Sequence, residues 1–283
     1  MKIVVFDLDE TLGYFTEFGI LWDCLIHYSK NRDKPSLSQS VFNDILDLYP
    51  EFLRPNIINI LNYLKDNKQS LCCDKLMIYT NNNGSNEWVQ YIINYFNKKI
   101  NFELFDQIIS AFKINGKVVE VCRTTHNKTY NDFIKCTKLP INSEICFLDD
   151  TFYPEMVNDN IYYINVKPYY YDLQFNYMLE KFSKSDVGKK IIDNDKNFIK
   201  IMSEQIKLYK YDCIDKKSKE YEVDKAIGKQ IIKHLQDFFS KTTKNKTIKN
   251  KNIKDNKLSK TRKTCITPRG ALAFKQFFAG DGS

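Results

Sequence analysis

Residues 1–12 read MKIVVFDLDETL, a short apolar run that ends in two closely spaced acids. Residues 2–6 are mostly apolar and β-branched, which predicts a strand buried on both faces of a sheet. Asp7 and Asp9 follow at the carboxyl end of this strand. Side chains two residues apart share one face of an extended chain, so both carboxylates can point into the crevice where open α/β sheets bind ligands.

The carboxylates of Asp7 and Asp9 need a partner of opposite charge. Their proximity is costly unless a cation or a shared proton relieves it. An acidic turn after a strand is the alternative interpretation of any isolated pair of this kind. The buried strand before the pair, and Thr11 and Leu12 after it, favour a catalytic site instead.

Two later segments repeat the pattern of an apolar strand followed by polar side chains. KLMIYT ends in Thr80, and ICFLDD ends in Asp149 and Asp150. In an open α/β sheet the carboxyl ends of the strands lie at the edge where ligands bind. The sequence therefore predicts that a hydroxyl group and four carboxylates meet in one site.

The order and spacing of DLDETL, IYT and FLDD resemble motifs I, II and IV of the haloacid-dehalogenase-like superfamily. Their form is that of the phosphatases that act on the C-terminal domain of RNA polymerase II and of their small relatives. The resemblance extends over residues 2–168. It implies an α/β fold with a Rossmann-like parallel sheet, helices on both faces of the sheet, and a small helical insertion after the first strand.

The resemblance also implies roles for the site residues. Asp7 is the nucleophile that becomes an aspartyl-phosphate, and Asp9 is the general acid and base. Thr80 binds the phosphoryl group through its hydroxyl. Mg²⁺ is the implied cofactor, held by Asp7, by the backbone carbonyl of Asp9 and by the acidic pair. Asp149 is expected to bind it directly, and Asp150 to bind through water or to orient a lysine.

That lysine is motif III, which the superfamily places about twenty residues before the acidic pair. Lys128 opens a predicted helix that runs to Lys135, and a helix N-terminus aimed at the strand ends can reach phosphate. Lys135, Lys138 and Arg123 are the other candidates, and a solvated helix face is the alternative for the whole set. The match is imperfect, because Asn131 stands where the relatives have lysine.

Two further residues have open roles. Asn81 either donates to the same phosphate or caps the helix expected over residues 85–97, and we favour the cap. Arg54 precedes Pro55 and resembles an arginine-proline signature of the same phosphatases. It lies either near the substrate phosphate or at the surface, at the start of a helix.

The net charge of +8 is concentrated near the end of the chain. Residues 240–263 hold ten Lys or Arg and one Asp, a local +9, so the remaining residues sum to 8 − 9 = −1. This segment is polar and repetitive, which predicts a disordered linker capable of nonspecific nucleic-acid contact. Residues 264–283 have no assigned role.

Eight cysteines are scattered without the spacing of a zinc site. They predict reduced, buried thiols in an intracellular protein, cytoplasmic or nuclear. No apolar run approaches the roughly 20 residues that a membrane span needs. We therefore expect a soluble protein.

The remaining chain divides into a core and a helical extension. We expect the core over residues 1–171, with a helical flap at about 13–50, and the extension over 172–239. Apolar periodicity predicts extension helices at 172–182, 187–209 and 220–239. We favour packing of the extension on the core over a separate partner-binding module.

The predicted function is Mg²⁺-dependent hydrolysis of phosphomonoesters through an aspartyl-phosphate. The resemblance favours phosphoserine or phosphothreonine in a protein as the substrate. A nucleic-acid 3′-phosphate, suggested only by the basic segment, and a small-molecule phosphate are the alternatives within the enzyme class. A non-catalytic binding or scaffold protein is the alternative outside it.

Overall fold

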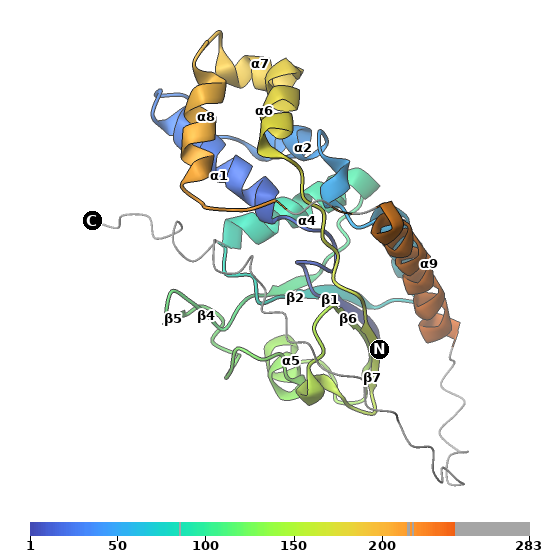
Figure 1. Ribbon diagram of the computed structural model, residues 1–283. Coiled ribbons are helices and arrows are strands. Elements are labelled where there is room, and N and C mark those ends of the chain that lie inside the picture. Colours follow the sequence, from blue (N-terminus) through green and yellow to red (C-terminus); the bar gives the residue numbers. More distant parts are fainter. Residues whose placement is uncertain (85, 214–215, 217, 241–283) are drawn as a thin grey trace.

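β1 (Lys2–Phe6) is the central strand of a five-stranded parallel sheet in the order β3-β2-β1-β6-β7 (Figure 1). The other strands are β2 (Lys75–Tyr79), β3 (Gln107–Ile109), β6 (Glu144–Asp149) and β7 (Ile161–Asn165). The computed structural model describes residues 1–84, 86–213, 216 and 218–240. The predicted α/β fold with a Rossmann-like parallel sheet is confirmed.

Side chains of β1 alternate between two apolar clusters. Ile3 and Val5 pack in the cluster of α5 (Tyr130–Thr137), and the alternate residues pack in the cluster of α4 (Asn86–Ile100). These β1 side chains are at most 1% exposed. Helices therefore cover both faces of the sheet, as Figure 1 shows for α4 and α5.

The edge beyond β3 carries a small hairpin. β4 (Lys113–Ile114) pairs antiparallel with β5 (Lys117–Val118). The sequence predicts an extended segment over residues 117–123, but the strand ends at Val118 and the chain then turns. Two 3₁₀ helices complete the connections of the core, η1 (Pro50–Phe52) and η2 (Pro154–Met156).

The insertion after β1 forms two helices, α1 (Thr16–Lys30) and α2 (Gln39–Leu46). Most of α1 is buried, because helix α8 (Phe198–Lys207) of the extension packs against it on the side that faces away from the sheet (Figure 1). Phe18, Leu21 and Leu25 are fully excluded from water. The predicted flap is therefore embedded between the core and the extension.

The extension begins with three helices: α6 (Phe175–Lys184), α7 (Asp186–Ile192) and α8 (Phe198–Lys207). The single helix predicted over 187–209 is wrong. Asp193 and Asn194 adopt left-handed conformations, with φ of 51° and 65°, which end α7. Short polar side chains tolerate this conformation better than most, and the break lets α7 and α8 both pack on α6.

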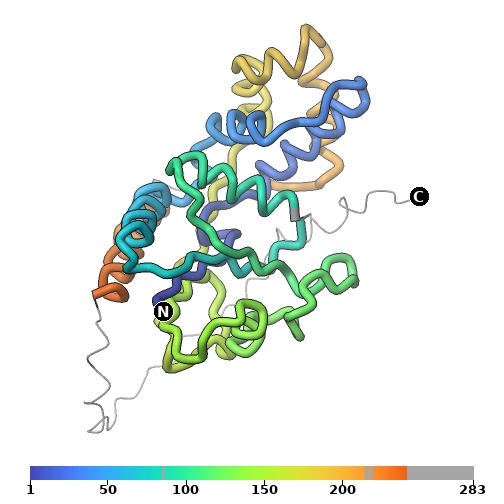
Figure 2. Tube along the Cα trace, turned by 180° about the vertical axis from the view of Figure 1, so that it is seen from behind, coloured from blue at the N-terminus to red at the C-terminus, as the bar shows by residue number. Residues whose placement is uncertain are grey.

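α9 (Ser218–Ser240) ends the described chain and lies beside α3 (Ile57–Gln69) and β7, as seen from behind in Figure 2. The lack of a side chain at Gly228 lets α9 approach the backbone carbonyl of Pro55. The prediction that the extension packs on the core is thus confirmed. The predicted linker beyond residue 240 and the segment 264–283 lie outside the described residues.

No helix of the described chain is both long and apolar enough to cross a membrane.

Cys122 and Cys136 form a disulfide, so the prediction of reduced thiols is wrong for this pair. The bond joins the loop before Lys128 to α5, and their Cα atoms are 5.0 Å apart. The spacing of the two cysteines in the sequence gave no sign of this, because the turn after β5 brings them together. Cys24, Cys73 and Cys146 are free and buried, as predicted.

Replacing the pair (Cys122→Ser with Cys136→Ser) is expected to lower the free energy of unfolding by about 3 kcal/mol, the loop-entropy value for a 14-residue separation. Urea denaturation without reductant measures this. The wild type in reductant is the control and should match the variant. Equal stability of oxidised and reduced wild type would contradict a structural role for the bond.

Glu17 connects α1 to the extension. Its carboxylate accepts the backbone N–H of Leu173 at 2.7 Å and the thiol of Cys213 at 2.9 Å. The side chain is fully buried, and burial raises the pKa of Glu17 from 4.5 to about 8. The carboxyl group of Glu17 therefore keeps its proton in the folded protein over a pH range in which the unfolded chain has already released it.

Stability should consequently fall as pH rises through this window. Relative to Glu17→Gln, the wild type is expected to lose up to about 1.4 kcal/mol of unfolding free energy per pH unit between 4.5 and about 8. Below the lower value the difference is constant, because both states bind the proton. Urea titrations of both proteins at several pH values test this, and a pH-independent difference would refute it.

Candidate active site

The turn after β1 is held closed by its own backbone. Glu10 donates its N–H to the carbonyl oxygen of Gly13 at 2.7 Å, and Gly13 also pairs with the backbone of Asp9. A Cβ at Gly13 would lie 2.6 Å from the carbonyl oxygen of Phe52, so glycine alone permits this approach. The turn leaves Asp7 and Asp9 at the carboxyl end of the central strand.

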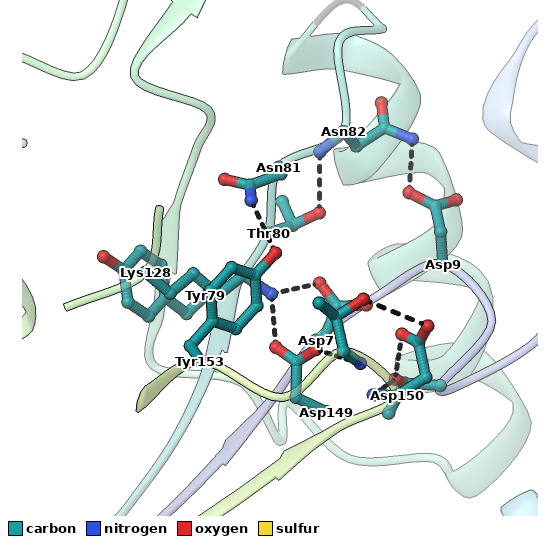
Figure 3. A network of polar contacts seen from close by, with 12 residues as sticks. Asp7, Asp9, Tyr79, Thr80, Asn81, Asn82, Lys128, Asp149, Asp150 and Tyr153 are labelled. Atoms are coloured by element: carbon teal, nitrogen blue, oxygen red, sulfur yellow. Dashed lines mark hydrogen bonds and ion pairs between the residues drawn. The ribbon is translucent and has the colours of Figure 1, made fainter. Parts of the chain in front are cut away.

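Lys128 lies between two of the predicted site acids. Its Nζ donates to Oδ1 of Asp7 at 2.5 Å and to Oδ2 of Asp149 at 2.6 Å (Figure 3). The side chain is 1% exposed. Burial lowers the pKa of Lys128, but the carboxylates of Asp149 and Asp7 outweigh it and raise the pKa overall. The lysine is therefore a charged ammonium fixed beside the predicted nucleophile.

The start of α5 places this lysine. The hydroxyl of Thr129 caps the helix by accepting the N–H of Asp132 at 3.1 Å. Lys128 directly precedes the cap, so its side chain leaves from the N-terminal end of α5 toward the strand ends. Lys135 and Lys138 are exposed on or just after this helix. Among the lysines considered from the sequence, only Lys128 contacts the acids within the described chain.

Asp149 and Asp150 have different partners. Asp149 binds Lys128 and accepts the N–H of Thr151 at 2.9 Å with its other oxygen. Asp150 accepts the hydroxyl of Thr11 at 3.2 Å. Of the two roles expected for Asp150, orienting the lysine is wrong, because Asp149 makes that contact, and binding a cation through water stays a prediction.

Asp9 lies beside the loop after β2. The side-chain amide of Asn82 donates to its Oδ2 at 2.7 Å (Figure 3). Burial, helped by the charge of Asp7, raises the pKa of Asp9 to about 7 despite this hydrogen bond. A carboxyl group with a pKa near neutrality can both donate and accept a proton.

Thr80 and Asn81 follow β2 directly. The Thr80 hydroxyl oxygen accepts the N–H of Asn82 at 2.9 Å, which leaves the hydroxyl proton free to be donated. Asn81 donates its side-chain amide to the Tyr153 hydroxyl at 3.0 Å and accepts from Arg123 at 2.7 Å. Asn81 does not cap α4, so that prediction is wrong, although the residue does line the pocket.

Arg54 is buried, so the alternative that placed it at the surface is wrong. It does not line the pocket, and a role near the substrate phosphate stays a prediction. The side chain is 1% exposed, and burial lowers the pKa of Arg54 to about 10. Its guanidinium donates to the backbone carbonyls of Thr11 at 2.5 Å, of Lys167 at 2.9 Å, and of Glu10. It ties the turn after β1 to the chain after β7.

Arg123, like Arg54, is a buried arginine that binds backbone carbonyl oxygens beside the site. It donates to the carbonyl oxygens of Thr80 at 3.0 Å, Ser110 at 2.8 Å and His126 at 3.0 Å, besides its contact with Asn81. Because the guanidinium faces backbone oxygens, Arg123 does not take the place predicted for the motif III cation. It holds the loop after β2 against the loop that carries Lys128.

The side chains enclose a pocket of about 210 Å³ at the carboxyl ends of β1, β2 and β6. All four predicted acids, Thr80 and Glu10 line it, and Phe15, Trp88 and Tyr153 contribute aromatic walls. The strand order reverses direction between β1 and β6, and residues from the ends of both strands line the pocket. Open α/β sheets bind ligands at such a reversal.

Three of the acids fit a metal ion. Asp7, Asp149 and Asp150 each offer one carboxylate oxygen, and these atoms lie within 4.8 Å of one another. A hard divalent cation prefers such oxygen donors. Lys128 neutralises only part of the negative charge gathered there, so a further cation would be favourable.

No protein-family model matches this sequence, and none of the curated proteins matches it significantly.

Sequence reasoning missed two contacts of the site. Asn82, the partner of Asp9, belongs to the run of three asparagines after β2, and its polar position at a strand end was a usable signal. Tyr153 lies in the chain after β6, and its hydroxyl accepts a hydrogen bond from Asn81. No local sequence pattern indicates this contact.

Proposed function

We propose that this protein is a Mg²⁺-dependent phosphomonoester hydrolase that works through an aspartyl-phosphate, with phosphoserine or phosphothreonine of a protein as its substrate. One observation carries the proposal. A buried lysine bridges an acid at the end of β1 to an acid at the end of β6, beside a second acid whose pKa is raised to about 7. The resemblance to motifs I to IV supports the same chemistry.

Each residue has a defined step in this reaction. Asp7 attacks phosphorus, the bond from phosphorus to the leaving oxygen breaks, and that oxygen takes the proton of Asp9. Asp9 then accepts a proton from water, whose oxygen attacks phosphorus and releases Asp7 and phosphate. Lys128 and the Thr80 hydroxyl stabilise the phosphoryl oxygens in both steps.

The acid cluster is suited to the cofactor. Asp7, Asp149 and Asp150 would hold Mg²⁺, and the backbone carbonyl of Asp9 is an expected further ligand. When bound, the cation would neutralise the carboxylates and the phosphoryl oxygens that approach them. The protein supplies the fixed positions of the acids through Lys128 and Thr11.

Release of phosphate from an aryl phosphate tests the proposal. We expect activity in the wild type with Mg²⁺, loss of activity with a chelator, recovery on adding Mg²⁺ back, and no comparable activity in Asp7→Asn. Equal rates in the two proteins, or no activity in either, would favour the non-catalytic scaffold.

A further inference from the structure

Every charged side chain that lines the pocket is acidic: Asp7, Asp9, Glu10, Asp149 and Asp150. The proposed reaction uses four of these acids as nucleophile, proton carrier and cation ligands. Glu10 has no part in it. Its presence in the pocket therefore needs a separate explanation.

Glu10 is held firmly in an unusual conformation. Its φ is 60°, a left-handed backbone that costs a non-glycine residue roughly 1 kcal/mol or more. The N–H of Glu10 donates to Gly13, and its carbonyl oxygen accepts the N–H of Tyr169 at 2.9 Å and the guanidinium of Arg54. These contacts fix the backbone of Glu10, and its carboxyl group interacts with that of Asp150.

Glu10 also connects the pocket to a partly exposed side chain. Its carboxylate hydrogen-bonds with the side chain of Tyr170, which is 46% exposed. Groups attached to a substrate on the solvent side of its phosphate would therefore pass close to Glu10. A carboxylate at this position would act on these neighbouring groups rather than on the reacting phosphorus.

The cationic side chains near the pocket, among the described residues, each bind other groups of the protein. Lys128 is enclosed between Asp7 and Asp149, and Arg54 and Arg123 are directed at backbone carbonyls. Lys216, close to Tyr170, pairs with a buried aspartate. Among the described residues none of these cations lines the pocket, so a second anionic group of a substrate would meet carboxylates there and no further ammonium or guanidinium group.

We infer that the site selects phosphoserine or phosphothreonine flanked by lysine or arginine, and that Glu10 is the residue that sets this preference. The inference rests on the proposed function and specifies its substrate class. A cationic flank is attracted by the carboxylate of Glu10, which neither Lys128 nor the proposed metal site neutralises, whereas an acidic flank or the next phosphate of a nucleic-acid strand is repelled.

Three phosphoserine peptides of equal length, with two Arg, two Ala or two Asp beside the phosphoserine, provide the test. At low ionic strength we expect kcat/KM to be at least about tenfold higher for the Arg peptide than for the Asp peptide, with the Ala peptide between them. High salt should compress the series, because it screens exposed charges. An equal or reversed order would overturn the inference.

Variants then test the role of Glu10. Glu10→Gln is expected to reduce the ratio of kcat/KM for the Arg peptide to kcat/KM for the Asp peptide by about threefold, because it removes one negative charge from the pocket. Glu222→Gln makes the same charge change on α9 outside the pocket and should leave the ratio unchanged. A ratio that survives in Glu10→Gln would overturn the assignment to Glu10.

Two further substrates keep this result separate from the proposed function. An aryl phosphate has no charged flank, so its Asp7-dependent hydrolysis reports the reaction alone. If it is hydrolysed and the peptide order fails, only the selectivity inference is lost. Faster hydrolysis of a 3′-phosphorylated oligonucleotide than of the Ala peptide would also overturn the selectivity inference. Absence of aryl phosphate hydrolysis would overturn both the proposed function and the selectivity inference.

Discussion

Asp7→Asn is expected to lower phosphate release from an aryl phosphate by at least about 10⁴-fold, because the amide oxygen is a far weaker nucleophile than the carboxylate. Asp9→Asn should lower it by about 10²–10⁴-fold for a different reason, the loss of the proton carrier. The aryl leaving group needs little protonation. The first step therefore continues in Asp9→Asn while the second step slows.

The two variants should thus differ in a covalent product. Acid quenching followed by mass spectrometry is expected to find one added phosphoryl group on the peptide that contains residue 7 in Asp9→Asn, and none in Asp7→Asn. Exposed Asp186 on α7 provides a matched Asp-to-Asn control that should behave as wild type. A phosphoryl group on another residue, or its persistence in Asp7→Asn, would rule out Asp7 as the nucleophile.

Lys128→Met is expected to lower the free energy of unfolding by about 3–5 kcal/mol when divalent cations are chelated, because it leaves a buried ion pair with one partner missing. Asp7 and Asp149 would both lose their hydrogen-bonded cation. Activity should also be lost, since no ammonium would then face the phosphoryl oxygens. Urea denaturation with chelator measures the stability change.

Mg²⁺ offers a sharper form of this test. If Asp7, Asp149 and Asp150 bind the cation, saturating Mg²⁺ should restore part of the stability lost in Lys128→Met, because it neutralises the same carboxylates. Lys135→Met, an exposed change on α5, should cost little with or without Mg²⁺. A variant as stable as the wild type in chelator would show that the buried ion pairs contribute nothing.

Local pattern was sufficient to predict β1, β2 and β6 and the residues at their carboxyl ends. β-branched apolar runs identify buried parallel strands, and the polar residues that follow them must lie at the ligand-binding edge of the sheet. These strand expectations needed information from only a few consecutive residues. Lys128, in contrast, was favoured over Lys135, Lys138 and Arg123 because the resemblance places a lysine about twenty residues before the acidic pair, and because Lys128 opens a predicted helix.

Contacts between distant segments were not predictable in the same way. Arg54 and Arg123 were expected at the surface or near phosphate, yet both are buried. Arg54 donates to backbone carbonyls of two separate segments, and Arg123 to those of three. The pattern of apolar residues over 187–209 continued through Asp193 and Asn194, and only packing on α6 and α1 shows that two helices are better than one. The Cys122–Cys136 bond likewise depends on a turn that no motif marks.

The sequence by itself determined the buried strands and the positions of Asp7, Asp9, Thr80, Asp149 and Asp150 at their carboxyl ends, and the order of its motifs implied the parallel sheet through a family resemblance. Apolar periodicity is a local property, so it can be read before the chain folds. Only the folded structure selects Lys128 from the four candidate cations. Only the tertiary structure decided which acid receives the lysine, how Asp9 comes to have a raised pKa, and why Glu10 faces the pocket. Burial and charge pairing depend on every segment that packs around a group, and those segments meet only in the folded protein.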